Sequence, residues 1–198
     1  MPLDDLDDKW SAPQREIMNA TYRTLLEYGY AGLSISRIGS EYKKSKSLIY
    51  HHYESKEELL VSFLEFAIDR FEAAITTGDS DEPEKNLKYI IDRLLSRRPA
   101  ADQWQIQKVL VTLRSQAVTS DSFREQFTRV DDRLVSIFSD IIERGITVGV
   151  FTDVDSSAVA EHILATINGA IYSDETTNRK EIQTVRTSLL AYLDTILY

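Results

Sequence analysis

The chain has 198 residues, of which 42% are hydrophobic, and it carries a formal net charge of −9 at pH 7. This length suffices for one or two small domains with a buried core, and the absence of cysteine excludes disulfides, thiolate zinc sites and cysteine nucleophiles. Apolar runs of only a few residues exclude a membrane span, and the acidic residues 1–8 are unlike a secretion signal, so we expect a cytoplasmic protein.

The first three predicted helices are closely spaced. Apolar residues at helical spacing predict a helix over residues 13–28, with Ser11 as its N-cap and Gly29 ending it. A second helix begins after Ser34, whose side chain can cap the exposed amides at its start. A third helix spans about residues 46–52 and follows the second across a tight turn.

The remaining predicted helices form the body of the chain. Ser55 is expected to cap a fourth helix that runs to Thr77, with Glu58 in the capping-box position. Asp121 is the expected N-cap of a seventh helix that ends near Gly145. The other predicted helices centre on residues 87–95, 104–117, 156–172 and 180–197. About nine helices and no convincing strand pattern place the fold in the all-α class.

The charge is distributed unevenly along the chain. Residues 13–56 hold seven lysines and arginines against four glutamates, a net charge of +3, whereas residues 57–198 carry −9. Phosphate backbones require local positive charge, so this asymmetry indicates an N-terminal DNA-binding module joined to an acidic regulatory domain. The acidic balance of the body also suggests a high-salt cytoplasm.

Residues 45–59 combine basic, hydroxyl and aromatic side chains in a short helix, followed directly by a capped helix. A short helix of this kind after a tight turn is typical of the DNA-reading element of helix-turn-helix proteins. The stretch 15–60 resembles the N-terminal domain of the tetracycline-repressor (TetR) family of transcriptional regulators. The resemblance is carried by Gly29-Tyr30, Ser34, Ile38, Ser45, the run Leu48-Ile49-Tyr50-His51-His52-Tyr53 and the run Ser55-Lys56-Glu57-Glu58-Leu59.

The second helix of such a motif enters the major groove, and the residues around it bind phosphates. Leu48 or Ile49 is expected to point inward, and Tyr53 to belong to the core. Lys43 and Lys44 stand where the family usually has a glycine followed by a small apolar residue. The predicted DNA-binding residues are Ser34, Arg37, Lys44, Ser45, Lys46, Ser47, Leu48, Tyr50, His51 and Lys56.

For the body, the resemblance implies a ligand pocket enclosed by helices four to seven and pairing of the last two helices with a second subunit. It also implies a division into a helix-turn-helix domain at 1–54 and a helical ligand-binding and dimerisation domain at 55–198. Apolar stripes on the last two helices support a homodimer independently. Candidate pocket residues are Trp104, Phe127, Phe138 and Asn168. Candidate interface residues are Ala165, Gly169, Val185, Leu189, Leu193 and Ile196.

A ligand-responsive repressor is the function that these features favour. It would bind a palindromic DNA operator as a dimer and be released by a small apolar effector. The sequence has no Glu-x-x-His pair for a helical di-metal site and no glycine loop for phosphate. The adjacent His51 and His52 lie about 100° apart on a helix and are unsuited to sharing one metal. No pattern therefore indicates a catalytic centre, a metal site or a cofactor. Two alternatives remain open: a helical ligand-binding or protein-interaction module without DNA binding, and a DNA-binding activator.

Overall fold

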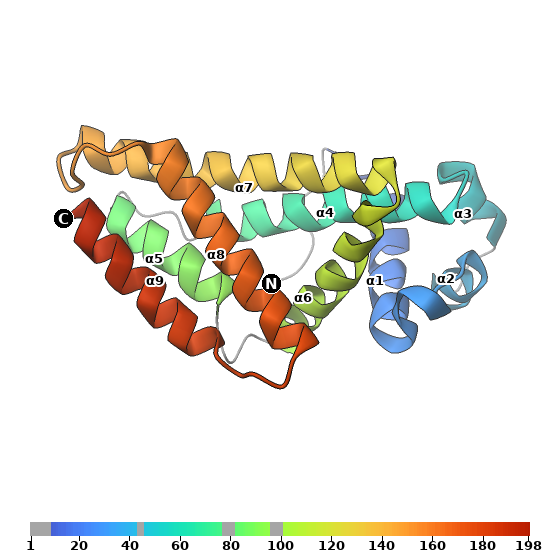
Figure 1. Ribbon diagram of the computed structural model, residues 1–198. Coiled ribbons are helices and arrows are strands. Elements are labelled where there is room, and N and C mark those ends of the chain that lie inside the picture. The colour runs from blue at the N-terminus through green and yellow to red at the C-terminus, as the bar shows by residue number, and fades with distance from the viewer. Residues whose placement is uncertain (1–8, 43–45, 77–81, 96–100) are drawn as a thin grey trace. The chain divides into compact units, whose positions relative to one another are not determined.

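The computed structural model describes residues 9–42, 46–76, 82–95 and 101–198, and for residues 46, 75–76 and 101–105 it describes the backbone alone. Within these ranges the chain is helical and has no strand (Figure 1). The predicted all-α class is therefore confirmed for this part of the chain. None of the helices described is long and apolar enough to cross a membrane.

Packing divides the chain into two compact units. Unit 1 comprises Met1–Thr77 and Lys108–Val130, and unit 2 comprises Gly78–Gln107 and Asp131–Tyr198. Unit 1 contains α1 (Ala12–Gly32), α2 (Ile35–Tyr42), α3 (Lys46–His52) and α4 (Lys56–Thr76), together with the short 3-10 helix η2 (Ser115–Val118). The helix α4 thus packs with the three N-terminal helices, whereas the division proposed from the sequence lies before it.

The ends of α1 follow from its sequence. At the start, the Gln14 side chain accepts hydrogen bonds from the backbone N–H of Ser11 at 3.1 Å and from its hydroxyl at 2.7 Å. Near the end, Gly29 leaves the helical conformation with φ of +63°, which glycine adopts without steric cost. One further turn continues to Gly32, so the helix is kinked at the predicted end and stops three residues later.

The helices α5 (Pro83–Leu94), α8 (Ser156–Thr176) and α9 (Ile182–Leu197) belong to unit 2. The helices α6 (Ala101–Arg114) and α7 (Asp121–Thr147) each contribute to both units. Within unit 2, α9 packs against α8 and α5 (Figure 1). Its core includes Ile91, Phe138, Ile142, Ile163 and Leu197.

Two features of α7 differ from the sequence prediction. The N-cap is Ser120 rather than Asp121, because the Ser120 hydroxyl accepts the backbone N–H of Phe123 at 3.3 Å. The helix also continues past Gly145 to Thr147. Gly145 has another role: its carbonyl accepts the N–H of Phe151 at 3.1 Å, and the Phe151 ring occupies the space where a side chain would start.

Candidate nucleic-acid interface

The helices α2 and α3 form a hairpin whose inner faces are buried in unit 1. The Ser34 hydroxyl caps α2 by accepting the N–H of Arg37 at 3.2 Å. Ile38 on α2 and Ile49 on α3 are fully buried, and Tyr53, just after α3, is 4% exposed. Of the two candidates for the inward position, Ile49 is therefore the buried one, and Tyr53 belongs to the core as predicted.

The opposite face of α3 is open to solvent. Tyr50 is 55% exposed, and Ser47 and His51 are also exposed. These positions are three and four residues apart, so they share one side of the helix. The side of α3 that faces away from the core therefore presents two hydroxyls and an imidazole, groups able to hydrogen-bond base edges and phosphates.

The other residues of this hairpin differ in their exposure to solvent. Leu48 is half-buried, which leaves part of its apolar side chain on the surface. His52 is half-buried, with its ring 5.4 Å from that of His51 and 6.2 Å from that of Tyr53. The predicted contacts Lys44 and Ser45 lie outside the described residues, as does the side chain of Lys46.

Lys56, in the first turn of α4, is held at the carboxyl end of α1. Its ammonium donates a hydrogen bond to the Tyr30 carbonyl at 2.9 Å and lies 4.2 Å from the centre of the Tyr30 ring. Burial lowers the pKa of this lysine below its ordinary value. Because an ammonium has three donors, the bond to Tyr30 fixes the group and leaves capacity for a phosphate oxygen.

Arg37 is held in a similar way from α2. One of its guanidinium nitrogens donates to the Gly32 carbonyl, and its central carbon lies 4.5 Å from the centre of the Tyr28 ring. Gly29, which has a positive φ, lies in the sequence between Tyr28 and Tyr30, the two tyrosines whose rings contact these cations. Arg37 and Lys56 therefore both serve as caps for the last turn of α1.

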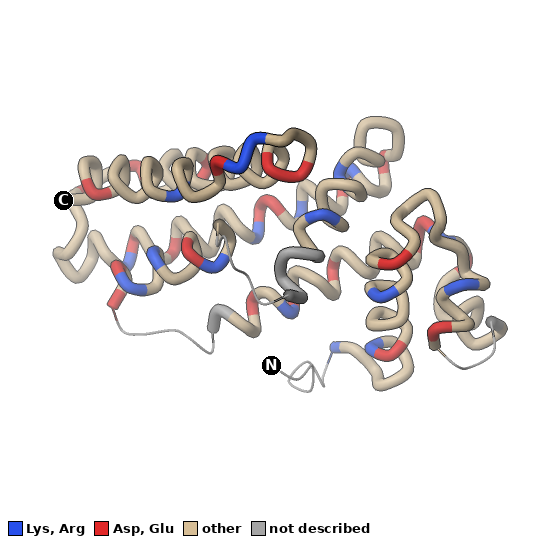
Figure 2. Tube along the Cα trace, turned by 90° about the horizontal axis from the view of Figure 1, so that it is seen from below, with Lys and Arg blue, Asp and Glu red and all other residues tan. Residues whose placement is uncertain are grey.

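The charge of unit 1 is partly neutralised within the unit. Arg23 on α1 and Glu41 on α2 form an ion pair with a nitrogen-to-oxygen distance of 2.5 Å. Figure 2 shows lysines and arginines interspersed with aspartates and glutamates along the helices. This pair commits one of the seven lysines and arginines counted in residues 13–56 and is already balanced within their net charge of +3. No local sequence pattern signals a pair 18 residues apart.

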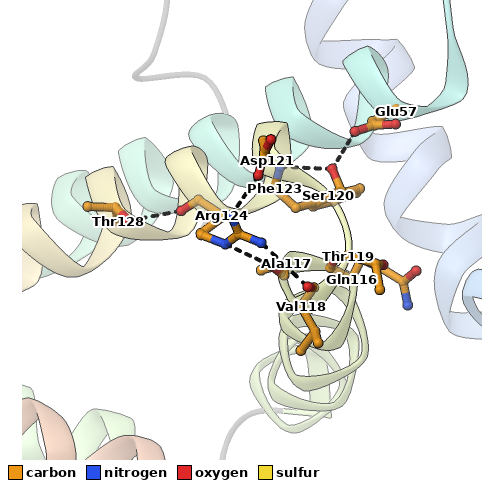
Figure 3. Close-up of polar contacts among 10 residues, drawn as sticks. All are labelled: Glu57, Gln116, Ala117, Val118, Thr119, Ser120, Asp121, Phe123, Arg124 and Thr128. Atoms are coloured by element: carbon orange, nitrogen blue, oxygen red, sulfur yellow. Dashed lines mark hydrogen bonds and ion pairs between the residues drawn. The ribbon is translucent and has the colours of Figure 1, made fainter.

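The start of α4 is also tied to the junction of η2 and α7, within unit 1. The Ser120 hydroxyl, which caps α7, donates to a carboxylate oxygen of Glu57 at 2.5 Å (Figure 3). The Arg124 guanidinium donates hydrogen bonds to two carbonyls of this junction, that of Ala117 at 3.2 Å and that of Val118 at 3.4 Å. Glu57 follows Lys56 directly, so this hydrogen bond reaches the same turn that contacts α1.

Of the four predicted pocket residues, the two phenylalanines are buried. Phe127 is 5% exposed in unit 1, with the guanidinium of Arg114 lying 4.6 Å from its ring centre. Phe138 is fully buried and Asn168 half-buried, both in unit 2. The side chain of Trp104 lies outside the described residues. Among described residues, no group of three His, Asp or Glu side chains could hold a metal ion.

The predicted interface residues separate into two sets. Ala165 and Gly169 on α8 are exposed, as pairing with another chain requires. Leu189 and Leu193 on α9 are each 3% exposed and belong to the core of the chain itself. Val185 and Ile196 are half-buried.

Two exposed tyrosines outside the set of predicted interface residues line the same outer surface. Tyr172 on α8 is 62% exposed, and Tyr192 on α9 is 43% exposed with its ring 4.7 Å from that of His162. The recurrence of residues 162, 165, 169 and 172 on one face of α8 was a sequence signal for Tyr172. Tyr192 lies on α9, and packing brings it beside His162.

Comparison with known proteins agrees with this geometry. Residues 17–63 match the family model described as "Bacterial regulatory proteins, tetR family", and residues 83–197 match the model "BetI-type transcriptional repressor, C-terminal". An uncharacterized HTH-type transcriptional regulator of Mycobacterium bovis is 23% identical over 154 residues, which cover 78% of this chain and 71% of that protein.

Solved structures extend the likeness over nearly the whole chain. A TetR transcription regulator from Haloarcula marismortui superposes with a TM-score of 0.86 and 34% identity, covering 96% of this chain and 100% of that one. A putative transcriptional regulator from Saccharomonospora viridis, solved in complex with choline, has a TM-score of 0.75 and 21% identity, covering 93% and 96%. With both family models and this fold, the chain belongs to the TetR family of transcriptional regulators.

Proposed function

We propose that this regulator is a ligand-responsive repressor that binds a palindromic operator as a homodimer in the cytoplasm. The observation that carries the proposal is the two-sided character of α3: Ile49 is fully buried, whereas Ser47, Tyr50 and His51 are exposed. A short helix anchored in this way presents its outer face to the major groove. Ser34, Arg37 and Lys56 flank it at two helix N-termini, which favour phosphate.

The dimer in this proposal uses the outer faces of α8 and α9. Ala165 and Gly169 are small and exposed, and nothing lies within 4 Å of a side-chain carbon added at Gly169. Small residues permit close helix approach, and the exposed rings of Tyr172 and Tyr192 supply apolar area for burial. Leu189 and Leu193 support the interface from within, because they hold α9 in the core of its own chain.

The effector in this proposal is a small apolar molecule. The support for an apolar effector is the burial of the aromatic side chains Phe127 and Phe138 on α7. The related regulator from Saccharomonospora viridis, solved in complex with choline, supports a small organic ligand for this fold, although choline itself is a cation. By thermodynamic linkage, an effector that releases DNA must bind the DNA-free form more tightly. Operator release then follows from a shift in population between the two forms.

The test of the proposal is binding to the duplex that lies upstream of the protein's own gene. Tyr50→Ala should weaken binding by about tenfold or more, since it removes an exposed side chain of the reading helix. Tyr89→Ala is the matched control: Tyr89 is 39% exposed on α5, in the other unit, and its loss should leave affinity unchanged. If Tyr50→Ala bound the duplex as tightly as Tyr89→Ala and the wild-type protein, α3 would be excluded as the reading element.

A further inference from the structure

Lys9 and Trp10, which precede the N-cap Ser11 of α1, are attached to the middle of α4. The indole N–H of Trp10 donates to a carboxylate oxygen of Asp69 at 2.8 Å, and the Lys9 ammonium lies 2.9 Å from the same oxygen. The Trp10 ring packs edge-on against Phe66, with 5.4 Å between ring centres. All of these groups belong to unit 1.

Asp69 is the centre of this cluster and is only 7% exposed. A carboxylate so far removed from water requires partners, and removing one partner of a buried charge costs far more than removing a surface contact. Glu65, one turn earlier, also pairs with Lys9 at 2.7 Å, but it is 41% exposed. Burial acts to lower the pKa of Lys9, but its bonds to Glu65 and Asp69 raise it above the ordinary value.

The cluster completes a set of three attachments between α1 and α4. Before α1, Trp10 binds Asp69; along α1, the Tyr22 ring stacks on Phe63 with 6.4 Å between centres; at its end, the Tyr30 carbonyl binds Lys56. Because α1 is attached before its start, along its length and near its end, it cannot slide or rotate against α4 without breaking a contact. Since α1 packs on α2, and α2 on α3, this fixes the orientation of the reading helix relative to α4.

We propose that Asp69 and Trp10 are positioning residues for DNA binding. They lie far from the reading helix, since Asp69 is thirteen residues beyond Lys56 and hence about 20 Å along α4. Their contribution is to hold the registry of α1 on α4, and with it the angle at which α3 meets the groove. The inference rests on the proposed DNA-binding function and assigns to that function residues outside the helix-turn-helix.

The test compares two isosteric charge neutralisations on the same helix, using the full-length protein and the duplex upstream of its gene. Asp69→Asn should weaken DNA binding by about fivefold or more, the lower end of typical coupling between sites. Glu65→Gln removes the exposed pair and should change affinity less than about twofold. Affinities are measured at 25 °C, and circular dichroism confirms that each variant is fully folded at that temperature.

A double-mutant cycle provides the second measurement. Trp10→Phe keeps the ring on Phe66 but removes the N–H donor, so it should weaken binding in the wild-type background. It should have little further effect beside Asp69→Ala, which removes the acceptor of that hydrogen bond. A purely structural role would lower the melting temperature of both variants and leave DNA affinity at 25 °C intact, which would overturn the inference. Failure of the wild-type protein to bind any duplex would instead overturn the proposed function, and the inference with it.

Discussion

Arg37 and Lys56 were predicted to bind phosphate, and each is held by a carbonyl of α1 and by a tyrosine ring. Such double anchoring restricts the rotamers of two long side chains before DNA arrives. The entropic cost of ordering them is then met on folding rather than on binding. At the scale of single residues, the last turn of α1 is therefore part of the candidate interface, although none of its side chains was predicted to touch DNA.

Two glycines allow backbone strain and steric clash to be separated. Gly29→Ala should lower the free energy of unfolding by about 1–3 kcal/mol, because φ of +63° with ψ of −178° is a conformation that essentially only glycine adopts, while nothing lies within 4 Å of an added carbon. Gly145→Ala should cost more, about 2–4 kcal/mol, because the added carbon would lie 2.0 Å from the Phe151 ring. Urea unfolding measures both, and the reverse order would contradict this assignment.

Tyr53 gives a prediction for alkaline pH. The phenol oxygen of Tyr53 is buried and makes no hydrogen bond within the described residues, and this burial raises the pKa of the phenol to about 12. Because the folded-state pKa exceeds the unfolded value of about 10, the neutral phenol contributes stability that is complete below pH 10 and is lost as pH rises through 12. The loss should approach about 2–3 kcal/mol.

The Tyr53→Phe variant isolates this contribution from those of other tyrosines. The difference in unfolding free energy between wild type and variant should be constant from pH 7 to pH 9 and should then shift in favour of the variant. Parallel curves up to pH 12 would show that the Tyr53 phenol ionises normally in the folded protein.

At the scale of whole elements, the starts of several helices could be predicted from sequence because capping is local. Ser11, Ser34 and Ser55 lie where the sequence predicted caps, and the hydroxyls of Ser34 and Ser55 accept backbone amides at 3.2 Å and 3.0 Å. The prediction was wrong by one residue at Ser120, since Ser120 and Asp121 are both good N-cap residues and composition alone does not choose between them.

Contacts between distant elements were beyond prediction from sequence. Trp10 and Asp69 are 59 residues apart, and Ser120 and Glu57 are 63 apart, so no periodicity or spacing rule links them. The burial of Leu189 and Leu193 is a similar case. An apolar stripe shows that a helix has a covered face, but its own chain and a partner chain cover apolar residues equally well.

Ser120 joins two elements, and its removal should affect both. Ser120→Ala deletes the cap of α7 and the hydrogen bond to Glu57, so we expect a loss of about 1–2 kcal/mol in the free energy of unfolding. Glu57→Gln keeps an acceptor for the Ser120 hydroxyl and should cost less than half as much. A Ser120→Ala variant as stable as wild type in thermal unfolding would show that this junction contributes nothing to unit 1.

At the scale of the whole molecule, dimer formation decides whether two reading helices act together. Gly169→Arg should place a charged side chain on the outer face of α8 and weaken self-association by about tenfold or more, since an unpaired charge would be buried in the interface. Ser136→Arg is the control, because Ser136 is exposed on α7, outside the proposed interface. Sedimentation equilibrium measures both, and a wild-type protein that remains monomeric at micromolar concentration would contradict the dimer.

In the proposed function this chain, with a net charge of −9, binds DNA through its locally basic N-terminal helices. The most direct measurement is the affinity of the purified protein for the upstream duplex across a series of salt concentrations. We expect saturable binding whose logarithm falls linearly with the logarithm of salt concentration, with a slope reduced by about one for each reading helix in Lys46→Ala. Absence of association with the duplex at every ionic strength would show that the protein does not bind this DNA as proposed.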